Sequence, residues 1–182
     1  SWGDVVTAQI QRIADAVRDD YSADAAPPLF VTIMHGGMPF AAQLAFALGE
    51  RGIDLEFDYL HATRYRGNTS GSGLAWLHRP ATPMRDRRVL LVDDILDEGH
   101  TLLAVKRWCE DQGATDVRVA VLAVKIHERR VEGIARELAV TGLRNVEAGR
   151  GVMIRASSLG KAKMVAQVVA ILLFLLSPPY PL

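Results

Sequence analysis

The sequence is poor in cysteine and has no excess of charge of either sign. Cys109 is the single cysteine among 182 residues, which excludes an intrachain disulfide and favours a reducing compartment, so we expect a cytoplasmic protein. Because Cys109 lies in a helical pattern beside Trp108, we interpret it as a small core residue rather than a nucleophile. The formal net charge is zero, so no overall field attracts nucleic acid, and we expect no nucleic-acid partner.

Three familiar sequence signals are also missing. The N-terminal stretch "SWGDVVTAQIQRIADAVRDD" is amphipathic and acidic, unlike the apolar segment of a secretory signal peptide. No G-x-x-x-x-G-K-[ST] pattern occurs, which excludes a Walker A phosphate loop. No G-x-G-x-x-G stands between a predicted strand and helix, so a dinucleotide-binding fold is unsupported. Any phosphate site must therefore be built in another way.

Acidic residues become scarce in the last quarter of the chain. Residues 136–182 carry six Lys and Arg but only two Asp and Glu, a net charge of +4, whereas residues 1–135 have a net charge of −4. No aspartate follows Asp116. This asymmetry is a reason to interpret the two segments separately.

Short apolar runs alternate with helical patterns along the first segment. The predicted strands are 29–34, 53–63, 74–79, 88–92 and 116–125, and the predicted helices are 4–20, 39–52 and 101–112. This alternation predicts an α/β fold with a parallel sheet and helices on both faces. Ligands of such sheets bind beyond the carboxyl ends of the strands.

One such strand end carries a cluster of acids. In "RRVLLVDDILDEGHTLLAV", residues 87–105, an apolar run ends at Asp93 and Asp94, and further acids precede Gly99. The amides that open the next helix at Thr101 can bind a phosphate, while carboxylates suit ribose hydroxyls or Mg²⁺. The segment therefore predicts a site for a phosphorylated sugar. The alternative is an acidic strand-to-helix turn in which Thr101 only caps the helix.

These residues carry a family resemblance. "VLLVDDILDEGHTL" resembles the phosphoribosyl-pyrophosphate motif of type I phosphoribosyltransferases, and "MHGG", "DYLHATRYRG" and "VLAVKIHER" resemble, in order and spacing, segments of hypoxanthine-guanine phosphoribosyltransferases. The resemblance spans about residues 5–135. It implies a Mg²⁺-dependent enzyme of purine salvage that transfers a phosphoribosyl group to a 6-oxopurine, with IMP or GMP and pyrophosphate as products. It also implies a homo-oligomer, either a dimer or a tetramer.

The resemblance assigns roles to the acidic segment. Asp93 and Asp94 would hold the ribose hydroxyls, partly through Mg²⁺, and Asp97 would act as general base or acid near purine N7. The residues implied to surround the 5′-phosphate are Asp97, Glu98, Gly99, His100 and Thr101.

Other roles fall on three further segments. Gly36 and Gly37 would offer backbone groups to the pyrophosphate. Lys125 would reach the exocyclic oxygen at purine C6. The residues implied to form a lid over the leaving pyrophosphate are Arg64, Tyr65 and Arg66.

The resemblance ends shortly after Lys125. The family would continue with a strand that carries an aromatic residue stacked on the purine and an acid that helps to hold Mg²⁺, but the only aromatic residues after Trp108 are Phe174 and Tyr180. We therefore expect an open sheet edge and impaired turnover. A module that binds phosphoribosyl pyrophosphate or nucleotide without turnover remains an alternative.

The tail resembles a different family. "ARELAVTGLR" and "GVMIRASSLGKAKMVAQVVAILLFLL" resemble the C-terminal part of a CDP-diacylglycerol–glycerol-3-phosphate phosphatidyltransferase, without that family's D-G-x-x-A-R motif. We therefore expect a chimeric chain, with a core at 1–135 and a helical tail at 136–182. As a helix, Met164–Leu176 would rise about 20 Å, short of the roughly 30 Å bilayer core. The composition of the tail predicts either a helix that is buried or covered by a partner, or membrane contact through residues 159–176. A membrane-associated fragment is therefore the third functional hypothesis.

Overall fold

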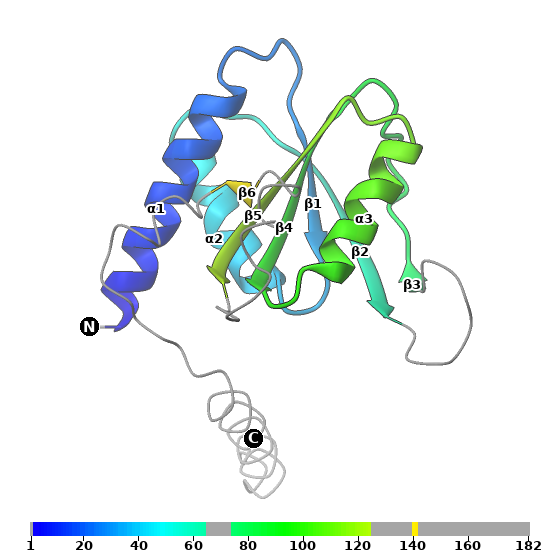
Figure 1. The fold of residues 1–182 in the computed structure, drawn as a ribbon. Helices are drawn as coiled ribbons and strands as arrows, with labels where there is room; N and C mark the ends of the chain where they lie inside the picture. The colour runs from blue at the N-terminus through cyan, green and yellow to red at the C-terminus, as the bar shows by residue number, and fades with distance from the viewer. Residues whose placement is uncertain (1, 65–73, 125–139, 142–182) are drawn as a thin grey trace, which may run out of the picture. The chain divides into compact units, whose positions relative to one another are not determined.

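The computed structural model describes residues 2–64, 74–124 and 140–141 of the chain. Figure 1 shows a sheet with helices packed against it. The elements are α1 (Trp2–Tyr21), β1 (Leu29–Ile33), α2 (Met38–Gly49), β2 (Glu56–Arg64), β3 (Leu74–His78), β4 (Arg88–Leu96), α3 (His100–Asp111), β5 (Asp116–Val124) and β6 (Val140–Thr141).

The sheet has the strand order β3-β2-β1-β4-β5-β6. All neighbouring strands pair in parallel except β2 and β3, which are antiparallel. The α/β class is therefore confirmed, with a mixed sheet in place of a purely parallel one. The antiparallel pair arises because β3 returns directly alongside β2, whereas the parallel neighbours are joined by crossovers.

The helices cover opposite faces of the sheet, as predicted (Figure 1). Val105 and Cys109 of α3 pack on one face against side chains such as Leu91. On the other face, α1 and α2 pack on side chains such as Phe30 and Leu90. Burial, and then the nearby Glu110, raise the pKa of the Cys109 thiol to about 12. The thiol therefore stays protonated at neutral pH, which supports its interpretation as a core residue.

Strand β4 is longer than predicted. It continues past Val92 to Leu96, so Asp93 and Asp94 belong to the strand itself and not to the loop after it. The strand extends this far because β5 pairs with it on one side beyond the point where the pairing with β1 has ended. The pairing with β1 stops at Val92, whereas the pairing with β5 continues to Leu96. The acids thus sit on a strand end whose β1 side is open.

The sheet edge beyond β5 also differs from the expectation. The two-residue strand β6 pairs in parallel with β5, with Val140 beside Val119 and Thr141 beside Ala120. The predicted open edge is therefore partly covered, and by residues that we assigned to the unrelated tail. The chain divides into Ser1–Arg150 and Gly151–Leu182, and all described residues belong to the first part. The boundary at 135–136 and the helical tail remain predictions.

Ion pairs hold the amino ends of the central strands. Arg88, at the start of β4, donates to Asp24 Oδ2 at 2.7 Å and to Asp116 Oδ2 at 2.9 Å. Arg118 donates through Nε to the same Asp116 oxygen at 3.0 Å. The Arg88 guanidinium also lies 4.1 Å from the ring centroid of Tyr21. This network joins α1, β4 and β5 at the end of the sheet opposite to the acidic cluster.

Candidate active site

The carboxyl ends of β1 and β4 bring two predicted segments into contact. The glycines that follow β1 lie directly against the acids of β4. A Cβ atom on Gly36 would stand 2.9 Å from both carboxylate oxygens of Asp94, and one on Gly37 would stand 2.7 Å from the carbonyl oxygen of Ile33 and 2.8 Å from that of Val92. At Gly37 the close atoms belong to the backbone, so only glycine fits there. Gly36, Gly37, Asp93 and Asp94 therefore lie together at this end of the sheet, and their binding roles remain predictions.

The two adjacent carboxylates create an unfavourable local environment. The Asp94 amide donates to Asp93 Oδ1 at 2.9 Å. Burial, and then the charge of Asp94, raise the pKa of the Asp93 carboxyl to about 7. No cation contributes to this shift among the described residues. An ion or a hydroxyl-bearing ligand that binds here would relieve the repulsion.

The acidic end of β4 offers two carboxylates to a metal ion. In residues 2–64, 74–124 and 140–141, no group of three or more His, Cys, Asp or Glu side chains could hold a metal ion. The site thus offers two carboxylates and no complete cage. Mg²⁺ commonly binds through one or two carboxylates and takes its other ligands from substrate oxygens and water. Asp93 and Asp94 fit this mode of binding.

The turn after β4 presents the start of a helix to the same region. Gly99 adopts a left-handed conformation with φ of 78° and precedes α3 with no side-chain cap. The helix begins at His100, one residue earlier than predicted, so the interpretation of Thr101 as the capping residue is wrong. The N-cap residue Gly99 therefore offers no side-chain acceptor of its own to the first amides of α3, and amides at a helix N-terminus bind phosphate. Asp97 and Glu98 are exposed in the turn before it.

The remaining predicted residues are only partly placed. Arg64 is the last residue of β2, while Tyr65, Arg66 and Lys125 lie outside the described residues. Lys125 directly follows Val124, and Val124 pairs with Leu96 at the end of β4. The chain thus leaves β5 beside the acidic turn, and the lid and purine-binding roles stay predictions.

Sequence reasoning missed a histidine next to the glycine segment. The rings of His35 and His61 meet edge to face, with centroids 4.5 Å apart. His61 lies on β2, where the preceding residue Leu60 pairs with Ile33 of β1. If the pairing of the two predicted strands had been known, it would have placed both histidines at the same end of the sheet. The sequence of one chain does not reveal which residues of two strands pair.

The match to a known family agrees with the observed fold. The phosphoribosyl transferase domain family matches residues 2–141 of the chain. This chain belongs to the phosphoribosyltransferase family. A second family, CDP-alcohol phosphatidyltransferase, matches residues 118–181. The C-terminal part of this phosphoribosyltransferase thus resembles a second, unrelated enzyme family. This second match supports the prediction that the chain is chimeric.

Individual relatives point in the same direction. The hypoxanthine-guanine phosphoribosyltransferase of Streptococcus pneumoniae strain R6 is 29% identical over 130 residues, which cover 71% of this chain and 69% of that protein. The Lactococcus lactis enzyme of the same name is 36% identical over 108 residues, 58% of this chain and 56% of the relative. Each match therefore covers only part of this phosphoribosyltransferase and part of the relative.

Solved structures give the same fold. The crystal structure of hypoxanthine-guanine phosphoribosyltransferase from L. donovani matches with a TM-score of 0.64 and 25% identity, over 71% of this chain and 73% of that one. The Trypanosoma cruzi hypoxanthine phosphoribosyltransferase in complex with IMP matches with a TM-score of 0.62 and 24% identity, over 69% and 70%. Among the helices described here, none is long and apolar enough to cross a membrane.

Proposed function

We propose that this chain transfers a phosphoribosyl group from phosphoribosyl pyrophosphate to hypoxanthine or guanine in a Mg²⁺-dependent reaction. The contact of Gly36 and Gly37 with the acids of β4, beside the start of α3, carries the proposal. The bacterial relatives named hypoxanthine-guanine phosphoribosyltransferase support the choice of purine. The products are IMP or GMP and pyrophosphate.

Each part of the site has a task in this reaction. The amides from Gly99 to Thr101, at the start of α3, bind the 5′-phosphate. Asp93 and Asp94 accept hydrogen bonds from the ribose hydroxyls and would hold Mg²⁺, which would supply positive charge to neutralise the leaving pyrophosphate. The backbone at Gly36 and Gly37 lies close enough to these acids to contact the same pyrophosphate. The substrate would thus lie across the carboxyl ends of β1 and β4.

The purine attacks ribose C1 at the same end of the sheet. The bond from ribose C1 to the pyrophosphate oxygen breaks, and a purine ring nitrogen forms the new bond to C1. Asp97, exposed in the turn after β4, takes the proton that the purine releases. By family resemblance, Lys125 binds the oxygen at purine C6, and Arg64, Tyr65 and Arg66 cover the pyrophosphate. Exclusion of water would protect the cationic ribose in the transition state.

The test is turnover by the purified full chain with Mg²⁺, phosphoribosyl pyrophosphate and hypoxanthine or guanine. We expect Asp97→Asn to lower kcat by about 10²- to 10⁴-fold. Asp111→Asn, an exposed aspartate at the end of α3, is the matched control and should leave kcat unchanged. Unchanged turnover in Asp97→Asn would refute the assigned acid–base role.

The replaced C-terminus favours a second outcome. Because only Phe174 and Tyr180 follow Trp108 as aromatic residues, the family's stacking contact on the purine has no evident counterpart. Such stacking contributes about 1–3 kcal/mol per base in proteins that bind single-stranded nucleic acid.

Binding of phosphoribosyl pyrophosphate without pyrophosphate release would identify a binding module. Partition into liposomes that deletion of 158–182 abolishes would identify a membrane-associated fragment. A cytoplasmic, oligomeric enzyme remains our proposal.

A further inference from the structure

The turn at residues 34–37, between β1 and α2, has different neighbours on its two sides. On one side, β4 brings the carboxylate of Asp94 against Gly36. On the other side, β2 brings the ring of His61 against the ring of His35. Because β1 lies between β2 and β4 in the sheet, a carboxylate flanks the turn on one side and an imidazole flanks it on the other.

The contact between the two imidazoles has a defined geometry. Their ring centroids are 4.5 Å apart and the ring planes meet at 75°, which is the edge-to-face arrangement that aromatic rings prefer. His35 is exposed, whereas His61 is half-buried on β2. The half-buried ring therefore supports the contact, and the exposed ring is the one that a ligand can reach.

Backbone pairing brings the two histidines together. The Met34 amide donates to the carbonyl oxygen of Leu60 at 2.8 Å, so the residues that precede His35 and His61 are hydrogen-bonded to each other. Leu60 also pairs with Ile33 in the ladder between β1 and β2. The ring contact is therefore a consequence of the strand register and does not depend on the rotamer of one exposed side chain alone.

An irregularity in the sheet marks the position of His61. The pairing of β2 with β3 shifts its register between His61 and Ala62. Such irregularities bend a strand and redirect its side chains, and they are common beside active sites. Just before the shift, His61 pairs with His78, whose ring stacks on Tyr59 with centroids 4.1 Å apart. The irregularity thus stands where β2 directs His61 to the ring of His35.

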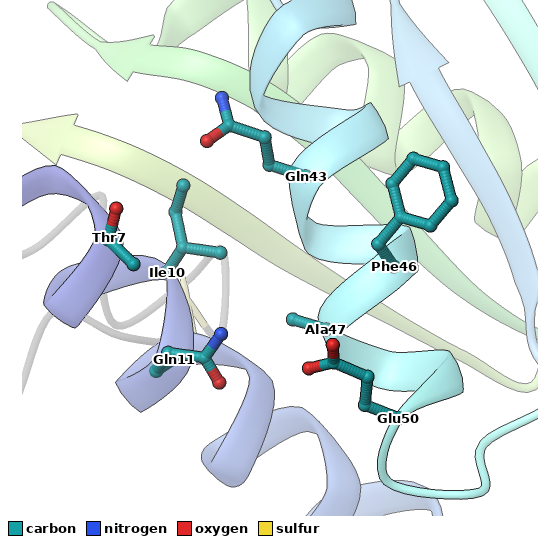
Figure 2. A pocket seen from close by; sticks show the side chains of 7 residues that line it. All are labelled: Thr7, Ile10, Gln11, Gln43, Phe46, Ala47 and Glu50. Atoms are coloured by element: carbon teal, nitrogen blue, oxygen red, sulfur yellow. The ribbon is translucent and has the colours of Figure 1, made fainter. Parts of the chain in front are cut away.

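Helix α2 holds the turn from its other end. Figure 2 shows α2 beside α1, with Gln11 of α1 and Ala47 of α2 lining the shallow pocket between the two helices. Just after α2, Arg51 donates to Gln11 Oε1 at 2.7 Å and to Asp15 Oδ1 at 2.8 Å. The turn that carries His35 is therefore attached to packed elements at both of its ends.

We propose that His61 is a positioning residue that holds the imidazole of His35 against the pyrophosphate group of the substrate. An imidazole carries an N–H donor in either charge state, and pyrophosphate oxygens accept such hydrogen bonds. The carboxylates of β4 repel the same anion, so a donor on the opposite side of the turn would offset that repulsion. The inference rests on the proposed function, which places the pyrophosphate at Gly36 and Gly37.

Isothermal titration calorimetry of the full chain with two ligands tests the inference. Pyrophosphate with Mg²⁺ probes the turn after β1, whereas IMP carries the 5′-phosphate and the purine but no pyrophosphate. His35→Ala should raise the Kd of pyrophosphate about tenfold, because a hydrogen bond to a charged group is lost. His61→Ala should raise it about three- to tenfold, because the ring of His35 then loses its support. Both variants should bind IMP as the wild type does.

Three further variants separate positioning from general support. His61→Phe keeps an aromatic ring against His35 and should bind pyrophosphate within about twofold of the wild type. The double variant His35→Ala/His61→Ala should be no weaker than His35→Ala, because His61 acts only through His35. His78→Ala is the matched control, since it removes a histidine that pairs with His61 but lies on β3, one strand further from the turn. It should leave both Kd values unchanged.

Three results would overturn the inference. Equal pyrophosphate binding by the wild type and His61→Ala would refute it and leave the proposed function standing. An equal loss of IMP and pyrophosphate binding in His61→Ala would show a merely structural role. A wild-type chain that binds neither ligand would refute the proposed function and the inference with it. Should His61→Ala fail to fold, His61→Asn removes the ring but keeps a polar side chain, and the same loss of pyrophosphate binding is expected.

Discussion

The two ends of strands β4 and β5 place aspartates in opposite environments. At the amino end, Asp116 accepts hydrogen bonds from Arg88 and Arg118, which hold its pKa below the ordinary value although partial burial opposes this. At the carboxyl end, burial and Asp94 raise the pKa of Asp93. The charge of Asp116 is balanced by two arginines of the chain, whereas the charge of Asp93 would need a bound cation or ligand to balance it.

This difference separates stability from function within one sheet. The amino end resembles an ordinary structural ion-pair network, which ties α1 to the strands. The carboxyl end combines like charges with a close glycine contact, an arrangement that costs stability and is typical of binding and catalytic sites. The same strands therefore carry the fold at one end and the candidate chemistry at the other.

The largest effect is expected at Gly37. In Gly37→Ala, the new Cβ would meet the backbone oxygens of Ile33 and Val92 at 2.7 and 2.8 Å, and backbone atoms cannot rotate away. We expect a loss of about 1–3 kcal/mol in the free energy of unfolding, measured by urea denaturation. Gly49→Ala is the control, since nothing lies within 4 Å of its Cβ position. Equal stability of the two variants would show that the close contact at Gly37 is absent in solution.

The sequence predicted the members of this site but not their contact. Asp93, Asp94, Gly36 and Gly37 stand at predicted strand ends, and parallel strands bring such ends to one edge. The distances between them depend on the register of β1 against β4, which pairs Leu29 with Val89. A register between distant segments is not encoded in either segment alone, so the close approach appears only in the structure.

The same substitution at the two strand ends should act in opposite directions. Asp116→Asn removes the acceptor of two guanidinium groups and should cost about 1 kcal/mol at pH 8. Asp93→Asn removes a buried charge that repels Asp94 and should stabilise the ligand-free chain by about 1 kcal/mol at pH 8. Chemical denaturation from pH 4 to pH 8 measures both effects.

The pH dependence of the two effects follows from the directions of the pKa shifts. The folded-state pKa of Asp116 lies below its ordinary 3.8, so its contribution is present above that pH and is lost as the pH falls through the folded-state pKa. The folded-state pKa of Asp93 is about 7, which is above its ordinary 3.8. The free energy of unfolding therefore falls as the pH rises from 3.8 through 7, because the folded chain holds the proton more tightly than the unfolded chain does. The Asp93→Asn effect should therefore vanish near pH 4. A destabilised Asp93→Asn chain at pH 8 would contradict the assignment.

Other features escaped sequence reasoning for related reasons. The extension of β4 to Leu96 was missed because acids are poor strand formers, and only its pairing with β5 keeps Asp93 and Asp94 in the strand. The amino-end network was missed although Arg88 and Asp116 both begin predicted strands. Arg88 and Asp116 pair directly in the sheet. Knowledge of how the two strands pair would therefore have predicted their ion pair.

The central claim is that the carboxyl end of β4 binds phosphoribosyl pyrophosphate with Mg²⁺. The most direct test is the thermal shift of the full chain on addition of both, with Asp94→Asn and Asp116→Asn alongside. At a ligand concentration of about 100 times Kd, binding contributes about 2.7 kcal/mol, so Tm should rise by about 5 °C in the wild type and in Asp116→Asn. Asp94→Asn should lose most of that rise. No rise in the wild type, or an equal rise in Asp94→Asn, would contradict the account.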